Sequence, residues 1–191
     1  PLRWEIGHAA YFHELWVLRR HLGEAPGRPD ADSLYDSITI AHDDRWDLPL
    51  PSLHDTLDYM RWVQDRVVAH LLADPPDARR DYLAQYAVFH EDMHTEAFTY
   101  TRQTLGYPTP AIGSERSPAW QAGPLGGDAA IPGGEFTLGA QPDADFCFDN
   151  EKWAHPREVR PFRIARAAVS NAEYAVFVDD GGYRRREMWD E

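Results

Sequence analysis

The sequence predicts a two-part protein, in which an N-terminal helical bundle precedes the beginning of an α+β domain. Three observations support this fold class. Apolar residues follow helical spacing in three stretches before residue 107, and residues 107–130 are rich in Pro, Gly and Ser without any period. Short strand-like pieces and one short helical stretch follow. We therefore divide the chain into a bundle over residues 1–106, a linker over 107–130 and the start of a second domain over 131–191.

The first predicted helix covers residues 3–22 and ends at Gly23, with two prolines shortly beyond as stop signals. Residues 23–37 have the composition of a loop, because Gly, Pro, Asp and Ser are frequent there. Residues 38–51 are predicted to be irregular and are closed by Pro49 and Pro51. A long connection therefore separates the first helix from the second.

The second predicted helix begins at Ser52, which forms a possible capping box with Asp55, and it ends before the prolines at 75 and 76. The third predicted helix runs from about Asp77 to Leu105, and Gly106 follows as its C′ residue. Three such helices can share one core. An antiparallel four-helix bundle needs one more helix, and we expect it before the first residue, because the chain begins directly in helix-like sequence.

The second domain is predicted from strand-like residues 134–139 and 157–166, followed by a helix from Asn171 to about Val178. Ser170 precedes this helix and has a glutamate three residues later, which is the capping-box pattern. We expect this segment to be truncated, since so short a stretch buries too little surface for a core of its own.

The composition excludes several functional classes. With 191 residues, 43% of them hydrophobic, the chain can bury a core. Its net charge of -13, with both signs interspersed, argues against nucleic-acid binding. It has neither an apolar run of membrane-spanning length nor a secretory N-terminus, so we expect no membrane partner. The single cysteine, Cys147, fits a cytoplasmic location and is interpreted as a buried, inert thiol and not a catalytic one.

Two histidines in the third predicted helix form a candidate metal site. His90 and His94 are four residues apart, so they project from one helix face one turn apart. With Glu91 the stretch reads "HEDMH", the pattern of a zinc protease in which the glutamate is a general base. A third ligand is then needed. His8, which follows Gly7 in the first helix, is a better source than His155 in the second domain.

Other histidines and one acidic residue carry weaker signals. Glu96 points roughly away from His94 around the helix, and we expect it to support the site or lie at the surface and not to bind a metal. A histidine pair at this spacing is also common in ordinary hydrogen-bonded settings. That interpretation is applied to the remaining bundle histidines, which are His13, His21, His42, His54 and His70.

Five motifs together resemble the sulfoxide synthases of ergothioneine biosynthesis, the EgtB family. They are "WEIGHAAYFHELW", "FHEDMHTEAF", "FDNEKWAHP", "VSNAEYAVFVDDGGY" and "RRREMWDE", in this order along the chain. The resemblance implies a DinB-like four-helix bundle joined to a formylglycine-generating-enzyme-like, C-type-lectin-like domain. It also implies a non-haem iron site, Fe(II), held by His8, His90 and His94, and an O₂-dependent reaction of hercynine.

One position departs from the ergothioneine pattern. Met93 stands where the family typically has a glutamine that contacts the hercynine imidazole, and a thioether cannot donate a hydrogen bond. Together with "AHDDRWDLPLP", this makes the chain more similar to the selenoneine synthase (SenA) branch, which joins hercynine to a selenosugar. The alternatives are C–S bond formation with γ-glutamylcysteine or cysteine, a DinB-type zinc or nickel thiol transferase, and a non-catalytic binding module.

The resemblance also implies substrate contacts. Arg45 aligns approximately with an arginine that binds the carboxylate of the sulfur donor, a task that suits a bidentate guanidinium. Trp153, Tyr183 and Trp189 are candidates, by composition only, for holding the trimethylammonium group of hercynine. The catalytic tyrosine of the family is expected beyond Glu191.

Overall fold

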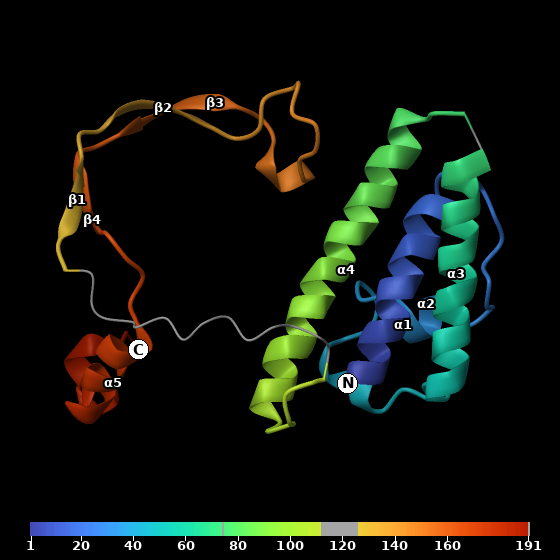
Figure 1. Ribbon diagram of the computed structural model, residues 1–191, viewed down its shortest axis with the longest axis horizontal. Helices are drawn as coiled ribbons and strands as arrows, with labels where there is room; N and C mark the ends of the chain where they lie inside the picture. The colour runs from blue at the N-terminus through green and yellow to red at the C-terminus, as the bar shows by residue number, and fades with distance from the viewer. Residues whose placement is uncertain (74, 112–125, 191) are drawn as a thin grey trace. The chain divides into compact units, whose positions relative to one another are not determined.

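The computed structural model describes residues 1–73, 75–111 and 126–190. The chain forms two units, Pro1–Pro110 and Ala111–Glu191 (Figure 1). The first unit therefore ends slightly beyond residue 106, the predicted end of the bundle. Each unit is described by itself.

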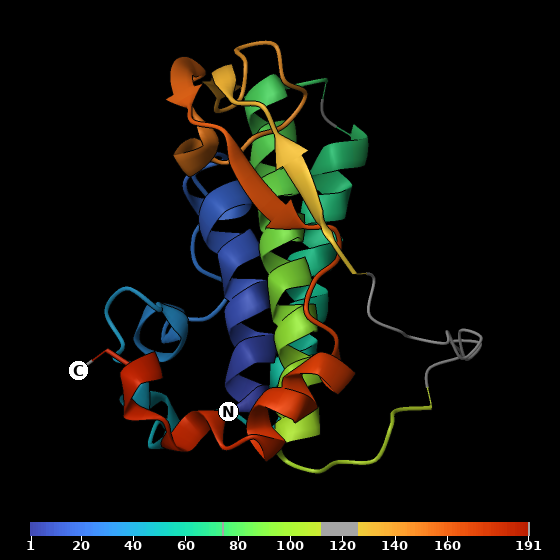
Figure 2. The same cartoon turned by 90° about the vertical axis from the view of Figure 1, so that its left-hand side faces the viewer.

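The first unit is built on three long helical segments. The first segment is α1 and its continuation η1, and it lies beside both α3 and α4 (Figures 1 and 2). It runs antiparallel to α4 and parallel to α3, which a long connection makes possible (Figure 2). The bounds are α1 Leu2–His13, η1 Glu14–Arg19, α3 Leu53–Ala73 and α4 Ala78–Thr104.

The predictions for the second and third helices are confirmed, including Gly106 as the C′ residue of the third. The Asp77 side chain accepts hydrogen bonds from the N–H groups of Arg79 and Arg80, at 2.8 and 3.1 Å, and so caps α4. Gly106 has a φ of +68°, the left-handed conformation that a C′ glycine adopts without strain. At the start of α3, the Asp55 N–H donates to the Ser52 hydroxyl at 3.1 Å.

The prediction of one regular helix over residues 3–22 is wrong. The α-helix ends at His13, and Glu14–Arg19 form a π-helix, η1. Glu14 in this wider turn is fully buried; its carboxylate accepts hydrogen bonds from the Tyr59 hydroxyl at 2.5 Å and from the Gly27 N–H. The hydrogen bonds that hold this carboxylate come from residues distant in sequence, so helical spacing alone does not predict the change of winding.

The prediction of a loop over residues 23–37 is corrected by a short helix, α2 Ala31–Tyr35. A helix of five residues is not stable by itself. Tertiary packing holds it, because its apolar side chains are buried and the Trp4 indole N–H donates to the Leu34 carbonyl at 2.8 Å. Another short element, the 3-10 helix η2 Asp43–Trp46, lies in the stretch predicted to be irregular.

The core of the first unit lies where η1, α2 and α3 meet α1, with a contribution from α4. Burying a large apolar side chain stabilises a fold by about 1.5–3 kcal/mol, so this cluster dominates the packing. Its members are Trp4, Ala10, Tyr11, Val17, Leu18, Ala31, Leu34, Tyr35, Tyr59, Val63, Val67, Leu83 and Ala84.

The second unit contains two short antiparallel strand pairs and a capped helix. Strand β1 Asp128–Ile131 pairs with β4 Phe162–Ala165, and β2 Gly134–Leu138 pairs with β3 His155–Val159. Helix α5 Asn171–Asp179 has the predicted capping box. The 3-10 helices are η3 Asp149–Glu151, η4 Gly182–Arg184 and η5 Arg186–Met188.

Two details of the second unit differ from the predictions. The predicted linker reaches residue 130, yet β1 begins at Asp128, because its pairing partner is the distant Ala165 and no local signal marks it. The single strand-like piece over 157–166 is divided between β3 and β4 at Pro161, which has no N–H to donate. Within the described part of the chain, no helix combines the length and the apolar character needed to cross a membrane.

Candidate metal centre

His8, His90 and His94 come together in the first unit. Each offers a ring nitrogen, and these three nitrogens all lie within 4.8 Å of one another. The Nε2 atoms of His8 and His90 are 3.3 Å apart. Two nitrogens bound to one metal ion at about 2.1 Å are roughly 3.0–3.4 Å apart, so this pair already has the separation of ligands on one ion.

His8 is held in position by its neighbours on α1 and α2. Its Nδ1 lies 2.7 Å from the Tyr35 carbonyl oxygen, which can only accept, so Nδ1 carries the proton and Nε2 has a free lone pair. The ring stacks on Trp4 with centroids 4.5 Å apart. Burial lowers the pKa of His8 to about 4, so the imidazole is neutral at pH 7, the form that binds metals.

Gly7 makes this arrangement possible. A Cβ at this position would lie 2.2 Å from the Tyr35 ring, closer than two carbons can approach. The missing side chain therefore lets Tyr35 pack directly on α1, and its carbonyl then reaches the His8 ring. The group that comes close to Gly7 is thus the Tyr35 ring.

His90 is less buried than His8 and packs against an aromatic ring. Phe12 stacks on its ring with centroids 3.7 Å apart. Burial lowers the pKa of His90 to about 3, with repulsion from His8 as the next cause. Its Nδ1 is buried and has no hydrogen-bond partner within the described residues, whereas its Nε2 faces His8.

His94 has a carboxylate partner that sequence reasoning missed. Its Nδ1 lies 3.0 Å from Glu5 Oε2, across the contact between α1 and α4. Glu5 precedes His8 by three residues and therefore lies on the same face of α1. A carboxylate one turn from a metal-binding histidine is a sequence signal that could have identified it.

The zinc-protease interpretation of "HEDMH" is not supported by the position of Glu91. Its carboxylate pairs with His13 Nε2 at 3.0 Å, and this contact holds the pKa of Glu91 below its ordinary value. Glu91 is not part of the three-histidine group. Glu96 is exposed and also lies outside this group.

The other histidines of the first unit have ordinary polar surroundings, as predicted. Each lies beside a carboxylate, at 2.6–3.9 Å. The pairs are His13–Glu91, His21–Asp77, His42–Asp43, His54–Asp58 and His70–Glu24.

Arg45 lies near the histidine cluster. Its guanidinium carbon is 4.1 Å from the centroid of the Trp4 ring, and the same ring stacks on His8. The Arg45 Nε is buried and has no hydrogen-bond partner in the described part of the chain. Met93, next to His94 in the chain, is 54% exposed and so is accessible from solvent.

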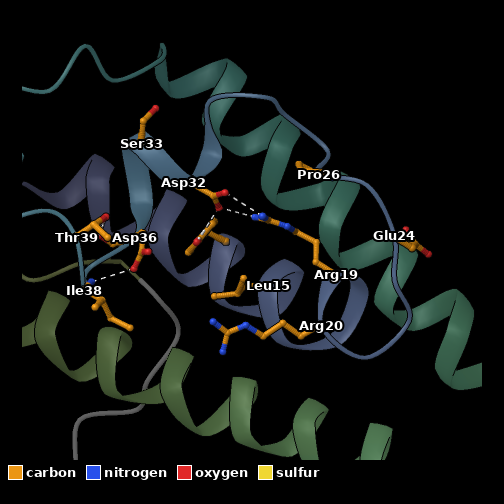
Figure 3. A pocket seen from close by; sticks show the side chains of 11 residues that line it. Leu15, Arg19, Arg20, Glu24, Pro26, Asp32, Ser33, Asp36, Ile38 and Thr39 are labelled. Atoms are coloured by element: carbon orange, nitrogen blue, oxygen red, sulfur yellow. Dashed lines mark hydrogen bonds and ion pairs between the residues drawn. The ribbon is translucent and has the colours of Figure 1, made fainter.

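The first unit also has a pocket of about 700 Å³ that does not include the histidines (Figure 3). Its charged groups neutralise one another, since Arg19 donates two hydrogen bonds to Asp32, at 2.6 and 2.9 Å. The Tyr11 hydroxyl donates to the same carboxylate at 2.9 Å. This network joins η1 to α2, and we assign it a structural role.

The aromatic candidates of the second unit lie in different surroundings. Tyr183 and Trp189 stack on each other with centroids 5.3 Å apart, beside Phe177. Trp153 is 75% exposed. Cys147 was predicted to be buried but is only half-buried, because the described residues of this unit bury few side chains.

Comparisons with known proteins show which proteins this chain is similar to. Residues 116–191 match the family model described as a sulfatase-modifying factor enzyme 1-like domain. The whole chain is similar to hercynine oxygenases. It is 32% identical over 99% of its length to the hercynine oxygenase of Mycolicibacterium smegmatis and 35% identical, also over 99%, to that of Mycolicibacterium thermoresistibile.

The similarity covers only part of the length of each relative. The chain spans about half the length of the curated relatives it matches, 45% and 43% for the two hercynine oxygenases. A formylglycine-generating enzyme from Streptomyces coelicolor is 37% identical over 40% of this chain and 24% of its own length. The similarity to hercynine oxygenases extends over both units of this chain.

The residues of the cluster fit a bound metal ion. Two of the three imidazoles are neutral at pH 7 by virtue of burial, and two have Nδ1 engaged by an acceptor. Imidazole nitrogen is a ligand for iron, zinc, nickel and copper. The arrangement is thus compatible with a metal in an enzyme related to hercynine oxygenases.

Proposed function

We propose that this chain is the metal-binding part of an EgtB-family, non-haem iron(II), O₂-dependent enzyme that modifies hercynine. One observation carries the proposal: His8, His90 and His94 come together in a chain that is similar to hercynine oxygenases over 99% of its length. On this proposal the first unit is a DinB-like bundle, and a fourth helix belongs to it.

The three histidines would hold the ion, and their chemistry suits this reaction class. Bound iron(II) would supply O₂ activation and attraction for an anionic thiolate or selenolate, because three neutral imidazoles leave its positive charge uncompensated. The Tyr35 carbonyl fixes the tautomer of His8. Trp4 and Phe12 cover the faces of His8 and His90 and limit the access of water.

Arg45 is proposed to bind an acceptor group of the donor substrate, which is a hydroxyl oxygen if the donor is a selenosugar and a carboxylate if it is γ-glutamylcysteine or cysteine. Its buried Nε has no partner in the described residues, and its guanidinium lies over the ring that stacks on His8. An acceptor group that satisfies this guanidinium would be held close to the metal ligands.

We propose a selenosugar as the chalcogen donor, so that the product contains a C–Se bond. The support is Met93, an exposed and weakly polar side chain beside His94 at the position of the family glutamine. The second candidate is C–S bond formation with γ-glutamylcysteine or cysteine, which the resemblance to the EgtB family implies.

A donor competition assay tests the proposal. The natural full-length protein, purified without oxygen and loaded with iron(II), is given hercynine, O₂ and either a selenosugar or γ-glutamylcysteine. Mass spectrometry of the products is expected to detect a C–Se product with the selenosugar. Turnover with γ-glutamylcysteine alone would reverse the choice of donor.

Metal analysis separates the remaining functional classes. One equivalent of iron is expected in protein isolated without oxygen. One equivalent of zinc or nickel, with no iron, would favour a thiol transferase. Protein that binds no metal would favour a non-catalytic binding module.

A further inference from the structure

We infer that Glu5 is a positioning residue of the metal site, whose carboxylate holds His94 in the tautomer and orientation that present Nε2 to the ion. The inference rests on the proposed metal site. It concerns a residue outside the three-histidine group, which would not touch the metal itself.

The contact between Glu5 and His94 defines the state of the ring. The Glu5 Oε2 atom lies 3.0 Å from His94 Nδ1, and an ionised carboxylate can only accept a hydrogen bond. His94 Nδ1 must therefore carry a proton, which leaves Nε2 as the nitrogen that can bind a metal ion. The His94 ring lies against the other two histidines, with centroid distances of 4.9 Å to His8 and 4.6 Å to His90.

The surroundings strengthen this contact. The side chains of both partners are only 20% exposed, so solvent screens the interaction less than at an open surface. A half-buried carboxylate also makes the imidazole it accepts from a more basic ligand. Glu5 thus combines orientation of the ring with added negative charge near the ion.

The position of Glu5 on α1 gives this helix two tasks at the site. It supplies His8 as a ligand and, one turn earlier, the group that orients a ligand from α4. His8 has the Tyr35 carbonyl as the corresponding partner. Two of the three histidines therefore have Nδ1 beside a hydrogen-bond acceptor, and these acceptors belong to α1 and α2.

A purely structural ion pair is the rival explanation, and the chain contains a matched control for it. Glu91 and His13 form the same type of pair between the same two helices, also at 3.0 Å. Neither residue belongs to the three-histidine group. A substitution at Glu91 therefore removes a similar α1–α4 contact without altering a ligand.

Titration with Co(II) alone tests the inference, with the visible absorption of the bound ion as the readout. We expect E5A to weaken Co(II) binding about 10–100-fold, the usual effect of removing the partner of a ligating histidine. E5Q is expected to recover part of the affinity, because an amide oxygen still accepts from Nδ1, and to shift the absorption bands. E91A is expected to bind Co(II) within about twofold of the wild-type chain.

Each outcome bears on one of the two proposals. A wild-type chain that binds no Co(II) would overturn the proposed metal site itself. Wild-type binding together with unchanged affinity and spectrum in folded E5A and E5Q would overturn the role of Glu5 and leave the metal site standing. Equal losses in E5A and E91A would show that Glu5 only joins the helices. Should E5A not fold, E5Q carries the test through its affinity and spectrum.

Discussion

The second ring nitrogen, Nδ1, has different surroundings in the three histidines of the cluster. For His8 its partner is the Tyr35 carbonyl, for His94 the Glu5 carboxylate, and for His90 there is none within the described residues. His90 is thus positioned by packing, chiefly by the Phe12 ring that stacks on it. The three ligands are expected to respond differently when their surroundings are changed.

Replacement of His90 by alanine is expected to abolish iron binding and leave the helical fold largely intact. The side chain provides a ligand and makes no hydrogen bond through Nδ1 that the fold would lose. Metal content by mass spectrometry and far-ultraviolet circular dichroism measure the two effects. His54→Ala, at a histidine whose side chain is 81% exposed, is the control and should bind iron as before. Undiminished iron in His90→Ala would contradict the assignment.

Gly7→Ala is expected to destabilise the first unit by about 1–3 kcal/mol, the usual range for overpacking. The added methyl group would lie 2.2 Å from the Tyr35 ring, so the ring and the carbonyl that holds His8 must move. Urea denaturation measures the loss. Gly126→Ala is the control, because nothing lies within 4 Å of a Cβ there. If the Gly7→Ala and Gly126→Ala variants are equally stable, α2 can move away from α1 without loss of stability, and the prediction is wrong.

At the scale of elements, α4 depends on its N-cap. Asp77→Ala is expected to lower the free energy of unfolding by about 1 kcal/mol, within the usual 0.5–2 kcal/mol, since two N–H groups lose their acceptor. The variant also loses a contact with His21 at 3.0 Å. Asp92→Ala removes the same charge from the exposed middle of the helix and should change stability by less than about 0.5 kcal/mol. A loss at Asp92 as large as at Asp77 would contradict the cap.

The connection after η1 is joined to α3 by a carboxylate with two partners. Glu24 lies 2.7 Å from Arg66 and 2.6 Å from His70, and the Arg66 guanidinium is the main reason that its pKa is below the ordinary 4.5. A depressed carboxyl pKa stabilises the fold at pH values above 4.5, and this contribution is lost as the pH falls through the folded-state pKa.

Glu24→Gln tests this pH dependence. The stability difference between the wild-type chain and this variant is expected to be largest above pH 4.5 and to shrink at lower pH. Urea denaturation between about pH 7 and pH 3 measures it. Glu96→Gln, at an exposed glutamate on α4, should give a small and flat difference. A difference that grows as the pH falls would contradict the assignment.

For the whole first unit, a metal ion would act as a cross-link between α1 and α4. A ligand that binds only the folded state stabilises it by about 2.7 kcal/mol at a hundredfold excess over Kd. Addition of Co(II) is therefore expected to raise the Tm, and chelation to reverse the rise. His90→Ala should show no such shift. An unchanged Tm at saturating Co(II) would mean that the ion does not bind the folded state in preference to the unfolded one, and it would contradict the cross-link.

Local signals in the sequence predicted much of this molecule. Helical spacing and the cap residues Ser52, Gly106 and Ser170 predicted α3, α4 and α5, because caps act on backbone groups within three or four residues. The spacing of His90 and His94 likewise places both on one helix face, whatever surrounds them.

Tertiary structure alone decided the rest. The π-helical turn at Glu14 and the short helix α2 depend on partners far along the chain, Tyr59 for the first and Trp4 for the second. The closeness of His8 to His90, and of Glu5 to His94, arises because α1 packs against α4. The sequence by itself determined α3, α4 and α5 and the histidines that α4 offers as ligands. Which ring nitrogen of His8 and of His94 can bind a metal was decided by side-chain contacts and burial, because these depend on residues distant in sequence.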